Sequence, residues 1–501
     1  MKSKSLVTTL AAFAGIAYFA FADEHSLDKY GGYTGIKGEA TGFFHFEKID
    51  GRYWFITPEG NVFFPVALSH LYSGESDLAA KNVYGGDADA WLKDSFEKAR
   101  AMGFNSALGS ATSPERNLNG FVDVEKAEAL FRENNFPYAV GVILLKHPWE
   151  FVDGETLPDI FDPSYKVLIE ERAEAVCPRY KDDPLVMGYY YGFGAFNKAD
   201  QWVNHHLSLP PGSPGRDAIV DVLIKRYGDD VASFNETYGT ELETIGALKD
   251  EVELSYEAAY ERRNFPSVRP TLDEDQLADF EAIIQHMCVT LYRIGHDAIR
   301  KHDENHLILG SFIKEWALDE ESWKAAAPYV DVMAPQHVNR EIDVNAIATA
   351  VDMPIIFSDE YFGFHYPEQA MGHGAVESHD ARGDIYRANL MRHCKDAQVI
   401  GVTYCACLFD QGGNTLIKGN QNGFYDLEGN PRPKLIADVT EMNHAVYNHA
   451  TQPADEEELG RLHDELFATW DQYQVRPHRP ANMRGKGGGG ARQSRVGGGG
   501  E

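Results

Sequence analysis

The stretch GYYYGFGAFNKADQW, residues 188–202, joins a run typical of a buried strand to a polar loop. The apolar run at 186–191 is short and has no polar face, as expected for a strand inside a parallel sheet. Seven further runs of this kind lie at residues 62–68, 106–109, 138–145, 306–312, 330–335, 355–359 and 399–405.

Helical patterns separate these runs. Apolar residues recur with a period near 3.6 in residues 90–102, 163–180, 277–302 and 384–396. Eight strands alternating with helices predict an α/β protein, a single (β/α)₈ TIM barrel over residues 61–450. Before it, FHFEKIDGRYWFITPEG predicts a short N-terminal β element within 23–60, with Asp50 and Gly51 as its hairpin turn.

Other parts of the chain depart from the barrel repeat. Residues 1–22 combine two lysines, an apolar run and a small-residue cleavage site, which predicts a signal peptide and a secreted or periplasmic protein. About 75 residues, 200–275, form an insertion after strand four, where loops of the catalytic face lie. An acidic helix is expected at 451–475, and the Gly/Arg-rich end at 476–501 has the composition of a disordered tail.

The charge excludes some partners. The chain has 46 basic and 77 acidic residues, a net charge of −31, and loss of Lys2 and Lys4 with the signal peptide makes it −33. Nucleic acids and anionic membranes are poor partners for such a surface, and no later segment predicts membrane insertion. The five cysteines lack a disulfide spacing and are expected to be buried free thiols.

Polar side chains follow most of the predicted strands. In a parallel barrel the chemistry lies at the carboxyl ends of the strands, so these residues form the candidate site. Side chains alternate along a strand, so Asp359 and Glu360 cannot both face the barrel mouth. The other strand ends supply His70, Glu315 with Trp316, His337, Tyr404, and Asp410 with Gln411. Polar groups beside aromatic rings are typical of a sugar-binding cleft.

The order of several segments resembles clan A glycoside hydrolases, in particular the agarase-like enzymes of family 50 and relatives. The matching pieces include RYWFITPEGNVFFPVALSH, WLKDSFEKARAMGFNSALGS, RYGDDVASFNETYGT and PIIFSDEYFGF. This resemblance implies a retaining mechanism with two carboxylates about 5.5 Å apart, an acid/base on strand four and a nucleophile on strand seven. Glu360 matches the nucleophile.

The acid/base of this pattern is missing. Ungapped alignment puts Gly192, Phe193 and Gly194 where the family has an Asp-Asn-Glu-like run. A loop insertion would instead match Trp202 and make Asn197 and Asp200 the polar pair. Alternatively Glu315 supplies the acid from strand five, or the acid is lost. All three remain open.

The sequence therefore predicts a secreted glycoside hydrolase acting on a β-linked, algal galactan or oligosaccharide, or else an inactive barrel that binds glycans in the same cleft. No cofactor fingerprint is present. The motif HDENH, residues 302–306, has a metal-like His spacing but joins a helix end to a strand start on the stability face of the barrel. A structural role is favoured there, and no metal site is predicted.

Overall fold

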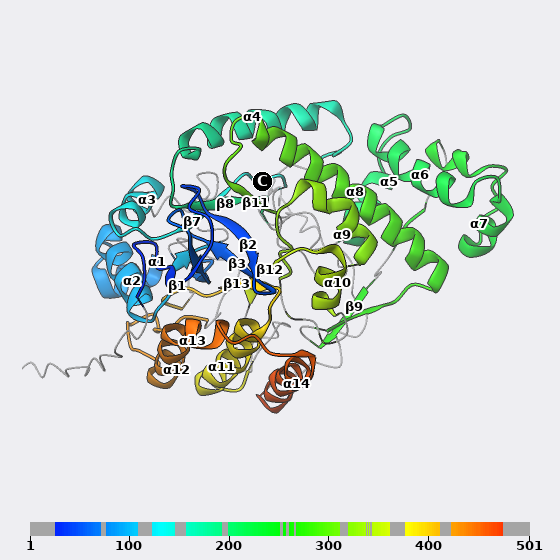
Figure 1. Ribbon diagram of the computed structural model, residues 1–501. Helices are drawn as coiled ribbons and strands as arrows, with labels where there is room; N and C mark the ends of the chain where they lie inside the picture. Colours follow the sequence, from blue (N-terminus) through cyan, green and yellow to red (C-terminus); the bar gives the residue numbers. More distant parts are fainter. Residues whose placement is uncertain are drawn as a thin grey trace, which may run out of the picture.

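The computed structural model describes residues 26–71, 77–108, 123–145, 157–192, 199–250, 254–256, 260–264, 267–310, 319–336, 338, 340, 343–360, 376–410 and 422–473 (Figure 1). The predicted signal peptide and the predicted tail at 476–501 lie outside these residues.

An antiparallel sheet comes first in the chain. Its strands are β1 (Tyr33–Lys37), β2 (His45–Ile49), β3 (Arg52–Ile56) and β4 (Asn61–Phe63), in the order β1-β4-β3-β2. The β2–β3 hairpin turns at Asp50 and Gly51, whose φ angles of 50° and 83° are both positive. Two-residue hairpins of this kind match the twist of the strands, so the predicted turn is confirmed.

A curled parallel sheet occupies the centre of the molecule (Figure 1). Its seven strands run in the order β11-β8-β7-β6-β5-β13-β12. They are β5 (Val66–Leu68), β6 (Ser106–Ala107), β7 (Tyr138–Gly141), β8 (Val186–Tyr190), β11 (Leu307–Gly310), β12 (Ile355–Glu360) and β13 (Val399–Tyr404). Each lies within one of the predicted runs or overlaps it.

Two predicted strands differ from the observed ones. The run at 62–68 is divided between β4 and β5, because Pro65 has no N–H to donate and the chain passes there from one sheet to the other. The run at 330–335 contributes an isolated bridge, Met333 to Ile355. This segment lies between the edge strands, since Asp331 N donates to Ile308 O of β11 and Ile356 N of β12 donates to Met333 O.

Helices pack around the parallel sheet. α4 (Pro163–Tyr180) and α8 (Glu274–Arg300) pack together on one side, and α11 (His379–Lys395) packs against α12 (Pro433–His444) and α14 (Glu456–Tyr473) on the opposite side (Figure 1). The remaining α-helices of this layer are α1 (Asp77–Tyr84), α2 (Ala88–Ala101), α3 (Val124–Glu133), α9 (Glu320–Ala326), α10 (Val344–Val351) and α13 (Val446–Ala450).

The predicted insertion is mainly helical. It contains α5 (Ala199–Leu207), α6 (Pro214–Tyr227), α7 (Val231–Tyr238) and the hairpin of β9 (Tyr260–Asn264) and β10 (Ser267–Pro270). These three α-helices pack against α8, where the buried Asp279 carboxylate accepts hydrogen bonds from Tyr227 and Tyr238 and pairs with Arg226. These polar links attach the insertion to the first half of the 27-residue helix.

Two further expectations concern thiols and membranes. Cys177, Cys288, Cys394 and Cys407 are buried free thiols, as predicted, whereas Cys405 is half-buried. Within the described ranges, every helix is too short or too polar to cross a bilayer.

Candidate active site

The end of β12 carries two adjacent carboxylates, and a bulge decides where each one points. Phe357 pairs with Val402 of β13, but Glu360 pairs with Tyr404, so three steps along β12 match two along β13. An extra residue in one strand reverses the alternation of side chains beyond it. Phe357 and Glu360 therefore face the same side of the sheet, and Asp359 faces the other.

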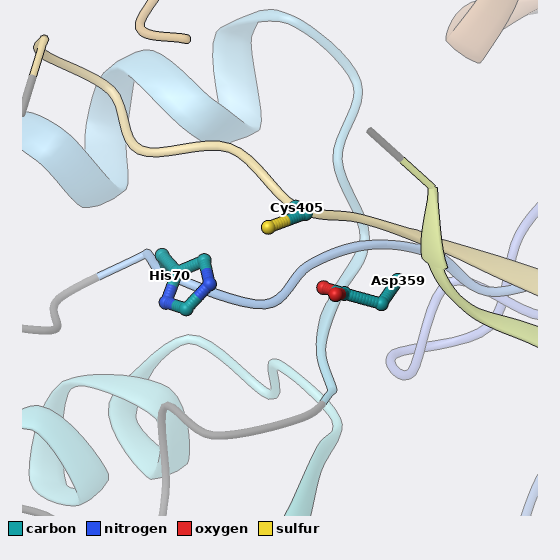
Figure 2. A group of neighbouring side chains, drawn as sticks. All are labelled: His70, Asp359 and Cys405. Atoms are coloured by element: carbon teal, nitrogen blue, oxygen red, sulfur yellow. The ribbon is translucent and has the colours of Figure 1, made fainter. Parts of the chain in front are cut away.

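Asp359 faces a group of polar side chains at the carboxyl ends of the strands. Its carboxylate accepts a hydrogen bond of 2.6 Å from Gln336 Nε2 and a longer one of 3.4 Å from Ser69 Oγ. Figure 2 shows Asp359, His70 and Cys405 directed toward one another. Asp359 is only 4% exposed, while His70 and Cys405 are half-buried. Side chains from the ends of β5, β12 and β13 thus meet at one point.

Glu360 is directed toward the helix layer. Its Oε1 lies 3.0 Å from His393 Nε2 of α11 and accepts a 3.3 Å hydrogen bond from Val338 N. The His393 ring packs against the Phe357 ring, with centroids 4.1 Å apart and the planes tilted by 34°. Burial lowers the pKa of His393 well below its ordinary value, so the imidazole is neutral. Its Nδ1 has no partner among the described residues, so Nε2 carries the proton and donates it to Glu360.

Glu360 was the predicted nucleophile, but the group at the strand ends contains Asp359. The bulge decides which of the two carboxylates faces that group, and alternation along the sequence cannot show where a strand gains a residue.

Tyr404 also faces the helices, although the sequence suggested the sugar cleft. Its ring stacks on Tyr386 of α11 at 4.3 Å, and its hydroxyl donates to Asn389 Oδ1 at 3.2 Å. The side chain is 2% exposed, which leaves no ring face for a sugar. Thr403 and Cys405, its neighbours in the chain, face the opposite side, as alternation requires.

Asp410 has a structural partner. Arg432 Nη1 donates to Asp410 Oδ1 at 2.8 Å, its second nitrogen contacts the other oxygen, and Gly423 N adds a hydrogen bond. Burial raises the pKa of the Asp410 carboxyl, and the Arg432 guanidinium opposes that rise. This bidentate ion pair joins the segment that ends at Asp410 to the segment that contains Arg432.

The residues proposed around the missing acid are only partly described. Asp200 lies in the first turn of α5 and is half-buried. Trp202 is 3% exposed and stacks on His206 with centroids 5.7 Å apart, so it belongs to the core of the insertion. The other predicted site residues lie outside the described residues; they are Asn197, Glu315, Trp316, His337 and Gln411.

Sequence reasoning missed Cys405 and His393. Cys405 was grouped with the buried thiols. It directly follows β13, and its side chain lies on the same side of the sheet as Asp359. His393 lies in the last turn of α11, 33 residues after Glu360 in the sequence. Nothing in the residues around it indicates its contact with Glu360.

Comparisons with known proteins identify a distant relative and solved structures with a similar fold. No family model matches the chain. The chain is 21% identical over 497 residues to beta-agarase B from Vibrio sp. (strain JT0107), an alignment that covers 83% of this chain and 50% of the relative. The chain therefore spans about half the length of this curated relative.

Solved structures show the same fold. An exo-beta-agarase superposes with a TM-score of 0.63 at 17% identity, covering 85% of this chain and 68% of the other. A second agarase gives a TM-score of 0.62 at 18% identity, with 85% and 68% covered. The chain is thus a distant homologue of beta-agarase B that has the fold of the agarase-like glycoside hydrolases.

Proposed function

We propose that this protein is a glycoside hydrolase that cleaves a β-linked algal galactan or its oligosaccharides. The single observation that carries the proposal is the buried Asp359 carboxylate, directed at polar side chains from two other strand ends. The homology to an agarase supplies the substrate class. The dense negative charge of the chain suits a neutral galactan better than an anionic polymer.

The proposal assumes a closed barrel. We infer that residues 330–335 complete an eight-stranded ring between β11 and β12. Hydrogen bonds on both sides of this segment support the closure, from Asp331 to Ile308 and from Ile356 to Met333. In such a barrel the group around Asp359 lies at the catalytic face.

Asp359 is our proposed nucleophile in a retaining mechanism. Gln336 Nε2 fixes Oδ2 of the carboxylate at 2.6 Å, and Oδ1, which has only the longer contact of 3.4 Å with Ser69 Oγ, attacks the anomeric carbon. A covalent glycosyl-enzyme would form at Asp359 and would then be hydrolysed by water. Glu360 in this scheme is a positioning residue, because it is hydrogen-bonded to His393 and Val338.

The acid/base of the pair has two candidates. A retaining enzyme needs a second carboxyl about 5 to 5.5 Å from the nucleophile. Asp200, in the first turn of α5, follows β8 in the sequence, and Glu315 follows β11 in the sequence. Substitution of each to its amide separates them, because only the true acid makes turnover strongly dependent on the leaving group.

Secretion is part of the proposal. A galactan polymer is too large to enter a cell, so its hydrolysis requires an enzyme outside the cytoplasm. The signal-peptide pattern at 1–22 supports this, and N-terminal sequencing of protein recovered from the medium or periplasm tests it. A mature chain beginning at Met1 would refute the assignment.

The activity test uses the full chain with agarose, other algal galactans and their oligosaccharides. We expect new reducing ends from at least one of them, and none with Asp359→Asn as the matched control. Tight oligosaccharide binding without reducing ends on any substrate would refute hydrolysis and favour a glycan-binding barrel.

A further inference from the structure

His70, Asp359 and Cys405 offer three kinds of metal ligand: an imidazole nitrogen, a carboxylate oxygen and a thiol sulfur. One such atom from each residue lies within 4.8 Å of the other two. Around tetrahedral zinc, neighbouring ligand atoms are about 3.5 Å apart, as follows from bond lengths of about 2.0 to 2.3 Å. Side-chain rotations that move each atom by about 1 Å therefore suffice for coordination.

The ligands come from three separate strand ends. His70 follows β5, Asp359 lies in β12 and Cys405 directly follows β13 (Figure 2). In the sheet, β13 lies between β5 and β12, so the three positions are adjacent. A site built on strand ends is held by the backbone of the sheet, which favours a defined coordination geometry.

Gln336 provides an independent sign of a missing ligand. Its side chain is 7% exposed, and its Nε2 donates to Asp359 Oδ2. A carboxylate only accepts, so this bond fixes the orientation of the amide and makes Oε1 the free end. That Oε1 has no hydrogen-bond partner among the described residues, although it is buried. A water molecule on a metal ion at Asp359 is a donor suited to it.

Burial is uneven across the group. Asp359 is almost completely buried, whereas His70 and Cys405 are partly exposed. An ion can therefore reach the site from the side of His70 and Cys405. Three protein ligands leave one of four tetrahedral positions for water, the arrangement typical of an accessible zinc site.

We propose that His70, Asp359 and Cys405 form a binding site for one zinc ion, with the fourth position taken by water near Gln336. Imidazole and thiolate ligands favour zinc over magnesium or calcium, which prefer oxygen ligands alone. The thiol of Cys405 transfers its proton to solvent when the sulfur coordinates the ion.

The site has a consequence for the proposed hydrolysis. Zinc coordination withdraws charge from the Asp359 carboxylate and places an ion where the anomeric carbon has to approach it, so attack on a sugar is suppressed. Zinc should therefore inhibit turnover, and a chelator should restore it. This inhibition rests on the proposed function, whereas the binding of the ion does not.

Binding is tested on the reduced, chelator-treated full chain. Competition with a chromophoric chelator and metal analysis after dialysis should give one tightly bound zinc per chain. Cys405→Ser and His70→Ala should each weaken it roughly 100-fold or more, and Gln336→Ala about tenfold. The matched control is Cys407→Ser, a thiol two residues further that is outside the group and should change the affinity less than about threefold.

Cobalt gives a second measurement of the same ligands. Wild type and Cys407→Ser should show the thiolate-to-cobalt charge-transfer absorbance, and Cys405→Ser should lose it while its circular dichroism stays native. Magnesium and calcium should not compete. Absence of stoichiometric zinc binding, or equal affinity in wild type and Cys405→Ser, would overturn the site.

The activity readout separates the two proposals. If the chain hydrolyses a galactan, micromolar zinc should inhibit wild type but not Cys405→Ser. Zinc binding that depends on Cys405, in a chain without hydrolysis, would retain the metal site and refute the proposed function. Hydrolysis unaffected by bound zinc would refute the shared role of Asp359.

Discussion

The two ends of the parallel sheet both contain a histidine and an aspartate, in opposite settings. Before β11, Asp303 accepts hydrogen bonds from the His306 ring, the backbone N–H groups of Asn305 and His306, and the Tyr189 hydroxyl. The other nitrogen of His306 contacts Asp183 O at 3.0 Å. Asp303 is 2% exposed and His306 is fully buried, so both side chains find their hydrogen-bond partners inside the fold.

At the carboxyl ends of the strands, the same residue types converge at a partly exposed position. His70 is half-buried, and Asp359 lies beside a glutamine oxygen that has no partner among the described residues. A saturated pair stabilises the fold, whereas a buried carboxylate beside accessible groups is available for a ligand. The two groups contain the same residue types. What distinguishes them is whether they lie at the amino or the carboxyl ends of the strands.

The largest effect is expected at the carboxyl end of the sheet, where the two carboxylates of β12 can be compared. Asp359→Asn should lower kcat/KM at least roughly 10³-fold, because an amide cannot act as the nucleophile. Glu360→Gln should lose roughly tenfold or less, since the amide oxygen still accepts the hydrogen bond from His393. Steady-state kinetics on the best galactan substrate measures both. A larger loss in Glu360→Gln would return the nucleophile to Glu360.

Much of the fold follows from sequence because its signals are local. Asp50–Gly51 between two alternating runs defines the hairpin, and short apolar runs locate the parallel strands. The site depends on non-local facts. The bulge in β12 arises from pairing with β13, and Asp410 is neutralised by Arg432, 22 residues away. Neither the reversed face of Glu360 nor the ion pair of Asp410 has a signal in the neighbouring residues.

The next largest effect is expected at the saturated end of the sheet. Asp303→Ala should lower the free energy of unfolding by about 3 to 5 kcal/mol, because Tyr189 and two backbone N–H groups lose their buried acceptor. Urea unfolding measures the loss. Asp359→Asn is the matched control and should cost less than about 1 kcal/mol. A larger loss of unfolding free energy in Asp359→Asn than in Asp303→Ala would contradict the stabilising role assigned to Asp303.

Acidification sharpens the same contrast. Burial tends to raise the pKa of Asp303, but the hydrogen bonds from His306 and Tyr189 prevail and lower it to about 2. The unfolded value is about 3.9, so the folded carboxyl binds its proton less readily and stabilises the protein above that pH. This contribution, about 2 to 3 kcal/mol, is lost as pH falls from about 4 to 2. The stability gap between wild type and Asp303→Asn should shrink over that interval; a constant gap would contradict an ionised Asp303.

The smallest effect concerns Tyr404, which marks the boundary between the strand ends and the helix layer. Tyr404→Phe removes the hydroxyl that donates to Asn389 but keeps the ring stacked on Tyr386. We expect a loss of about 1 kcal/mol in unfolding free energy and an unchanged KM for oligosaccharides, because the ring lies among helices and touches no ligand. Tyr386→Phe is the matched control, since its hydroxyl likewise donates within the helix layer, to Asn443. A KM raised in Tyr404→Phe but not in Tyr386→Phe would mean that Tyr404 faces the sugar, and the register of β13 that puts Cys405 beside Asp359 would then fail with it.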